Sequence, residues 1–157
     1  MRAKLPVFLI LILFLFAAKS HCAEKFSSEA TQISVSFSNI AMVEFKSLDP
    51  SELSYAEVGS RIQEYGARAA TVLLDAGLTS ERASSIMEQA ASWYGKTLEI
   101  LFDGGDYNAA IQDYSMKLSD LCSKERISLD TQQRLISLSS LQLQNMNSLF
   151  QQLGGNY

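Results

Sequence analysis

Carboxylates are the only side chains in this sequence whose number and placement leave a catalytic option open. Glu88, Glu99, Asp103 and Asp106 lie in the middle of the chain and are candidates by position. Glycoside cleavage needs only two carboxyl groups at a suitable separation, one of them acting as an acid. A small carboxylate-dependent hydrolase that acts on wall polymers is therefore one alternative for the function.

The residues that most other enzymes require are missing. His21 is the only histidine, and it lies at the predicted cleavage boundary after an N-terminal apolar segment. The rest of the chain therefore has no imidazole for a nucleophile pair, a proton shuttle or a zinc site. Gly104-Gly105 is typical of a helix end rather than of a phosphate-binding loop. We expect a protein that is not an enzyme and that has no cofactor and no metal.

The first twenty residues predict export. Arg2 and Lys4 flank the start of an uncharged apolar run from Leu5 to Ala18, which is the pattern of a secretory signal peptide. As a helix this run rises about 21 Å, less than the roughly 30 Å of a bilayer core, so we expect no permanent membrane span. We predict a cleaved signal peptide at residues 1–20 and one domain at 21–157, periplasmic or extracellular. An uncleaved anchor is the alternative.

The two cysteines depend on where the signal peptide is cut. Cleavage after Ser20 keeps Cys22, which can then pair with Cys122 in an oxidising compartment, whereas cleavage after Cys22 leaves Cys122 alone. An acylated Cys22, as in a lipoprotein, is a further alternative. A disulfide between Cys22 and Cys122 closes a loop of roughly a hundred residues and is expected to stabilise the fold by about 3–5 kcal/mol.

The charge balance excludes nucleic acid as a partner. The chain has 13 basic and 17 acidic residues, and it lacks the clustered Lys and Arg that bind a phosphate backbone. Without residues 1–20, ten basic and seventeen acidic side chains remain, for a net charge of −7. This acidity favours either a basic partner or simple solubility.

Helix signals recur along the rest of the chain. Asp49-Pro50-Ser51-Glu52 combines a capping residue, a proline suited to the first helical position and a glutamate three residues after the cap. Apolar residues follow at helical spacing, and Gly77 and Gly104-Gly105 interrupt the pattern. Helices are predicted to begin near Lys25, Pro50, Ser80, Asp106 and Asp130, and either Thr79 or Ser80 is predicted to cap the helix that begins near Ser80. The predicted fold is an all-α, single-domain antiparallel helical bundle of about five helices.

The segment from Lys25 to Ser47 fits two structures. Ile33 to Ser38 alternates between apolar and polar residues as in a half-buried strand, whereas Phe26, Ala30, Ile33 and Phe37 form a helical stripe. No other stretch offers a strand as a partner, and a lone strand leaves its backbone groups unsatisfied. We therefore predict a helix.

One stretch resembles a single tetratricopeptide hairpin. An aromatic helix containing Trp93-Tyr94 precedes the turn Gly105-Asp106-Tyr107, and Ala109-Ala110 and Tyr114 follow. The resemblance covers about a fifth of the chain, and no second copy recurs at a 34-residue spacing. It implies a helix hairpin here, and not a solenoid, which needs about three repeats.

The C-terminal helix is the most informative region for function. After Arg134 no charged residue occurs up to Tyr157. Ile136, Leu143 and Phe150 recur every seven residues, beside a second apolar stripe on the same helix. The helix is either buried on both sides by its own chain, or this stripe binds a protein partner or a second copy, because an uncharged face avoids the cost of desolvating charge.

We therefore predict a non-enzymatic periplasmic or secreted protein that binds another protein, as an adaptor, chaperone or inhibitor. The predicted partner-binding residues are Ile136, Leu143 and Phe150. A carrier of an apolar ligand is a further alternative, because a helix with two apolar faces can also line a lipid pocket.

Overall fold

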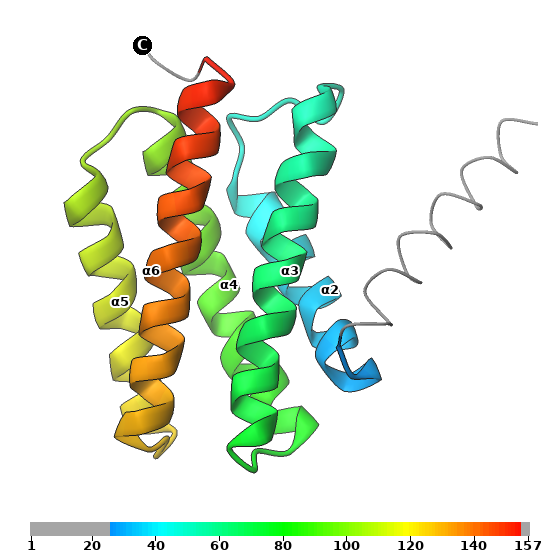
Figure 1. Ribbon diagram of the computed structural model, residues 1–157, viewed down its shortest axis with the longest axis vertical. Coiled ribbons are helices and arrows are strands. Elements are labelled where there is room, and N and C mark those ends of the chain that lie inside the picture. Colours follow the sequence, from blue (N-terminus) through cyan, green and yellow to red (C-terminus); the bar gives the residue numbers. More distant parts are fainter. Residues whose placement is uncertain (1–25, 155–157) are drawn as a thin grey trace, which may run out of the picture.

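A computed structural model of the protein describes residues 26–154, in which five helices pack into one all-α domain. The predicted signal peptide and Cys22 lie outside the described residues. The helices are α2 (Ser28–Glu44), α3 (Leu53–Asp75), α4 (Ser80–Phe102), α5 (Tyr107–Lys124) and α6 (Leu129–Gln152). Figure 1 shows α3 to α6 running alternately up and down, with α2 packed against α3 and α4. None of these helices has the length and apolar character that crossing a membrane requires.

Side-chain caps begin four of the five helices. The side-chain oxygens of Ser27, Thr79, Asp106 and Ser128 each accept a hydrogen bond from the backbone N–H three residues later. These bonds satisfy donors that the first turn of a helix leaves free. The sequence signals at Thr79 and Asp106 are thereby confirmed.

Helix α3 begins three residues later than its sequence signal predicts. The carboxylate of Asp49 accepts hydrogen bonds from the backbone N–H and the hydroxyl of Ser51, both at 2.8 Å, and so closes a local turn. These bonds, the backbone bond above all, lower the pKa of Asp49. The helix begins at Leu53, and its N-cap residue, Glu52, makes no side-chain cap. The predicted start at Pro50 is therefore wrong, because Asp49 binds two residues ahead instead of capping a helix.

Helix α2 confirms the helical interpretation for residues 28–44 of this segment, and its small residues explain the alternating pattern. Ser34 and Ser38 are buried, one turn apart, on a face that packs against α3. A Cβ atom added at Gly66 of α3 would lie 3.2 Å from the Cα of Ser34. The serines therefore mark a close helix contact rather than the exposed face of a strand.

The contact between α2 and α4 is closer still. A Cβ atom added at Gly95 of α4 would collide with the carbonyl oxygen of Ala41 and would lie 2.8 Å from the Cβ of Glu44. Helix α2 is thus fixed between two neighbouring helices by two glycines, and its position tolerates no larger side chain at Gly95.

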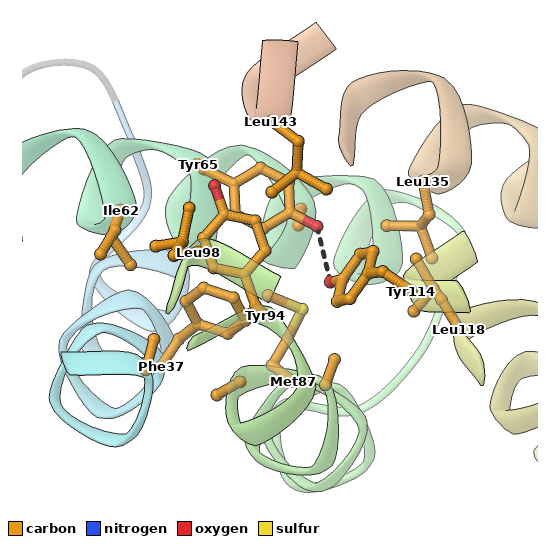
Figure 2. Close-up of a cluster of buried hydrophobic side chains, with 14 of the residues drawn as sticks. Phe37, Ile62, Tyr65, Met87, Tyr94, Leu98, Tyr114, Leu118, Leu135 and Leu143 are labelled. Carbon is orange, nitrogen blue, oxygen red and sulfur yellow. Dashed lines mark hydrogen bonds between the residues drawn. The ribbon is translucent and has the colours of Figure 1, made fainter. Parts of the chain in front are cut away.

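Aromatic rings from four helices form the centre of the core (Figure 2). Phe37, Tyr65, Tyr94 and Tyr114 come from α2, α3, α4 and α5, and each is at most 2% exposed. The rings of Tyr65 and Tyr94 are stacked with centroids 4.7 Å apart, and Tyr94 meets Tyr114 edge to face at 5.6 Å. These offset and edge contacts are the arrangements that aromatic pairs favour.

Candidate interaction surface on helices α3 and α6

The structure places two of the three predicted partner-binding residues in the core. Leu143 and Phe150 are 0% and 1% exposed, and Ile136 is partly buried against the same core. The ring of Phe150 packs on Phe45 and Phe102, with centroids 5.4 and 5.2 Å away. In this arrangement a partner has no access to Leu143 or Phe150. Their burial agrees with the interpretation of α6 as a helix covered by its own chain.

Leu129, 74% exposed, lies at the start of α6 on the same seven-residue stripe, whereas a second exposed leucine of α6 lies on a different face. Leu141 is 57% exposed, and Leu138 is partly buried beside it. Together with Val72 of α3 they line a surface groove between the two helices, which lie side by side in Figure 1. The groove is open to solvent, and Leu141 is one of the apolar residues of α6 that the chain itself leaves exposed.

A second stretch continues this groove along the same pair of helices. It shares Leu138 and Leu141 with the first stretch and adds Gln142 and Asn145 of α6. The Gln142 side chain donates to the backbone carbonyl of Arg61 at 3.2 Å, which ties α6 to α3 within the groove. We refer to the two stretches together as the α3/α6 groove.

Three arginines line the α3/α6 groove. Arg61 and Arg68 lie on α3, and Arg134 lies on α6. Each pairs with an acid on its own helix, at 3.0 Å to Glu57, 2.8 Å to Glu64 and 3.2 Å to Asp130, respectively. All six side chains are between 42% and 75% exposed. Pairs of this kind contribute only about 0.3–0.5 kcal/mol, so the guanidinium groups exchange partners at small cost.

The carboxylates proposed as catalytic candidates make structural contacts. Glu99 accepts from the backbone N–H and hydroxyl of Ser47 at 3.0 and 2.6 Å, and Asp103 accepts from the same hydroxyl at 3.1 Å. These bonds tie the segment after α2 to the end of α4. Glu88 binds the hydroxyl of Ser36 of α2 at 3.3 Å, and Asp106 caps α5.

The fold brings Glu99 and Asp103 together and keeps Glu88 apart from Glu99. Glu99 and Asp103 are neighbours because they share the Ser47 hydroxyl. Glu88 and Glu99 are eleven residues apart on α4, which corresponds to about 16 Å along a helix and exceeds the 5–10 Å that glycosidases use. Within residues 26–154, no group of three or more His, Cys, Asp or Glu side chains is arranged to hold a metal ion.

Cys122 is a free, fully buried thiol on α5. Burial raises its pKa from 9.0 to about 11, so the thiol stays protonated at neutral pH and is a poor nucleophile. Its predicted partner, Cys22, lies outside the described residues, so the disulfide remains a prediction.

The core contains a hydrogen-bonded chain of hydroxyl groups that the sequence does not reveal. The Tyr65 hydroxyl lies 3.1 Å from that of Tyr114 and 2.6 Å from that of Ser139, which is bonded to the Leu135 carbonyl at 2.6 Å. Because Ser139 gives its single proton to that carbonyl, it accepts from Tyr65, and Tyr65 accepts from Tyr114. The Tyr94 hydroxyl is buried without a partner.

These tyrosines remain neutral inside the fold. Burial raises the pKa of Tyr65, and it raises the pKa values of Tyr94 and Tyr114 further. Sequence spacing cannot show which of these hydroxyls meet, because the partners come from separate helices. The cluster is enclosed on all sides, so it acts as a packing and hydrogen-bonding element of the core.

Comparisons of the chain with protein-family models, with curated proteins and with solved structures find no match.

Proposed function

We propose that this is a non-enzymatic helical protein, exported to the periplasm or secreted, that binds another protein through the α3/α6 groove, as an adaptor, chaperone or inhibitor. One observation carries the proposal. Leu141 is 57% exposed beside Leu138 and Val72, on a helix that has no charged residue after Arg134 within the described range. An uncharged apolar centre with a polar rim is the usual composition of a protein interface.

The groove also has the rim that such an interface needs. Gln133, Ser137, Gln142 and Asn145 of α6 border the leucines and offer neutral hydrogen-bonding groups. Neutral amides are desolvated at less cost than charged groups when a partner covers them. A partner can therefore bury the leucines without leaving an isolated charge inside the interface.

One observation favours a carboxylate-dependent hydrolase as a second candidate. Glu99 and Asp103 bind the same Ser47 hydroxyl, so two carboxylates are held close together on the surface. If they are catalytic, Glu99→Gln abolishes cleavage of wall polymers. If Glu99→Gln instead retains full binding of a protein partner and loses no turnover relative to the wild type, the binding function is supported.

The binding function is tested by cross-linking in the cells that make the protein. A photoreactive amino acid is placed at Leu141, and in a control chain at Met116 of α5, which is 60% exposed and lies outside the groove. We expect position 141 to capture a discrete protein that position 116 does not. Equal capture at both positions, or none at 141, contradicts the proposal.

A further inference from the structure

A row of alternating charges runs along the exposed face of α3. At intervals of four, three and four residues, one side of the helix carries Glu57, Arg61, Glu64 and Arg68. The four side chains are between 42% and 50% exposed, and three of them line the α3/α6 groove. Each arginine pairs with the glutamate one turn before it, so the row has no net charge.

The order of these charges makes the row complementary to its own copy. Glu57 and Arg68 lie equally far from the middle of the row, and so do Arg61 and Glu64. When two α3 helices lie antiparallel about that middle, each glutamate therefore opposes an arginine of the second copy. A parallel alignment in register places every charge opposite its own equivalent, and like charges repel. The row thus favours a second copy of this chain in one orientation.

The apolar part of the groove lies at the same level as the middle of the row. Gln142 of α6 donates to the backbone carbonyl of Arg61, so Leu141 lies beside the stretch of α3 between Arg61 and Glu64. A two-fold axis at this level brings Leu141, which is 57% exposed, close to Leu141 of the second copy. Contact between the two leucines removes apolar surface from water on both copies.

Helix α6 adds no charge that opposes this arrangement. Within the described part of α6, Asp130 and Arg134 form an ion pair in the first two turns, and no charged residue follows them. When two α6 helices lie antiparallel about Leu141, this pair faces Gln152 and Ser148 of the second copy. Both of these side chains are exposed and can form hydrogen bonds with the charged groups.

The face formed by α3 and α6 is large enough for a dimer. The helices have 23 and 24 residues, so each is about 35 Å long, and two adjacent helices are about 20 Å wide. The resulting face of roughly 700 Å² per copy is close to the 800 Å² or so that each partner buries in a standard protein interface. Its three arginines are balanced by three acids, so two copies meet there without the repulsion expected for a chain with a formal charge of −4.

From these observations we infer that two copies of the protein form a dimer through the α3/α6 groove, with α3 antiparallel to α3 and α6 antiparallel to α6. The inference goes beyond the proposed function, because it names what covers the groove when no other protein is bound. A different protein then competes with the second copy for the same leucines, so that its binding and dimerisation exclude each other.

Charge reversal tests the dimer. In one variant, Arg61→Glu/Arg68→Glu, all four positions of the row are acidic, and in the other, Glu57→Arg/Glu64→Arg, all four are basic. We expect the wild type to sediment as a dimer at micromolar concentration, and each variant alone to have a dimer Kd raised about tenfold or more, because like charges then face each other. An equimolar mixture of the two variants should restore the dimer as a heterodimer, which variants that merely unfold cannot do.

The control variant makes the same change in net charge elsewhere. Lys117→Glu/Lys124→Glu reverses two exposed cations of α5, outside the groove. It should leave the dimer Kd within about threefold of the wild type, because salt screens charges that lie far from the contact. A monomeric wild type, an equal loss in the control, or a mixture that does not form the heterodimer overturns the inference.

Cross-linking at position 141 separates the inference from the proposed function. If the photoreactive residue captures a different protein in cells while the purified chain is monomeric, the dimer inference is wrong and the binding function stands. If it captures only a second copy of the chain, the inference is supported and the proposed binding of another protein fails.

Discussion

The unpaired hydroxyl of Tyr94 makes a direct prediction about stability. It is buried without a hydrogen-bond partner, and a group in this situation costs about 1–3 kcal/mol. Tyr94→Phe removes the hydroxyl and keeps the ring that stacks on Tyr65 at 4.7 Å and meets Phe37 at 5.4 Å. We therefore expect the variant to raise the free energy of unfolding by about 1 kcal/mol, which is the lower end of that range because a small void replaces the oxygen.

Tyr65→Phe is the matched control, because it removes the same atom from a residue that uses it. The Tyr65 hydroxyl bonds to both Tyr114 and Ser139, so its loss removes two buried hydrogen bonds from the core. We expect a decrease of about 1–3 kcal/mol in the free energy of unfolding.

Urea unfolding followed by circular dichroism measures both changes. The slope of free energy against urea concentration should be the same in the wild type and the two variants, so that a shift of the midpoint reports stability alone. A decrease of 1 kcal/mol or more for Tyr94→Phe refutes the reasoning, because it means that the hydroxyl is paired in solution.

Three further predictions concern other elements. Gly95→Ala should lower the free energy of unfolding by about 1–3 kcal/mol, because its Cβ collides with α2, whereas Gly59→Ala, whose Cβ meets nothing within 4 Å, should raise it by up to about 1 kcal/mol. Urea unfolding measures both, and equal effects contradict the close contact. Arg126, with φ of 58°, ends α5 in the left-handed region, so Arg126→Gly should raise the melting temperature; a decrease would contradict the strain. The pKa of the Cys122 thiol is raised from 9.0 to about 11 in the folded state, so the unfolded state loses this proton first as the pH rises. The contribution of this thiol to stability is therefore full below pH 9 and is lost as the pH rises to 11. Cys122→Ala should delay the onset of this loss to about pH 10, where the buried tyrosines begin to contribute in the same direction; an unchanged onset in urea midpoints measured from pH 7 to 11 contradicts the assignment.

The sequence predicts the helices well, because their signals are local. The caps at Thr79 and Asp106 and the stop at Gly77 act within one turn of the chain, so a short window of residues is sufficient to find them. The start of α3 is missed for the same reason. Asp49 can cap a helix or close a turn with Ser51, and the choice depends on how the loop before α3 is placed.

The face of α6 that contacts solvent is not predictable from its spacing alone. Ile136, Leu143 and Phe150 recur every seven residues, and core helices and interface helices share this period. Phe150 is buried because Phe45 and Phe102 lie against it, and these residues come from elsewhere in the chain. The same holds for the hydroxyl of Tyr65, whose partners are 49 and 74 residues away in sequence.

The most direct test of the binding function uses the partner protein that cross-links at position 141. This partner is purified, and its affinity for the chain described above is measured by titration calorimetry. Leu141→Asp places a charge on the apolar floor of the α3/α6 groove, and Met116→Asp places one on an equally exposed site of α5. We predict that Leu141→Asp raises the Kd at least tenfold with unchanged helical content, while Met116→Asp leaves it within twofold of the wild type. An unchanged Kd for Leu141→Asp would contradict a role of the groove in binding.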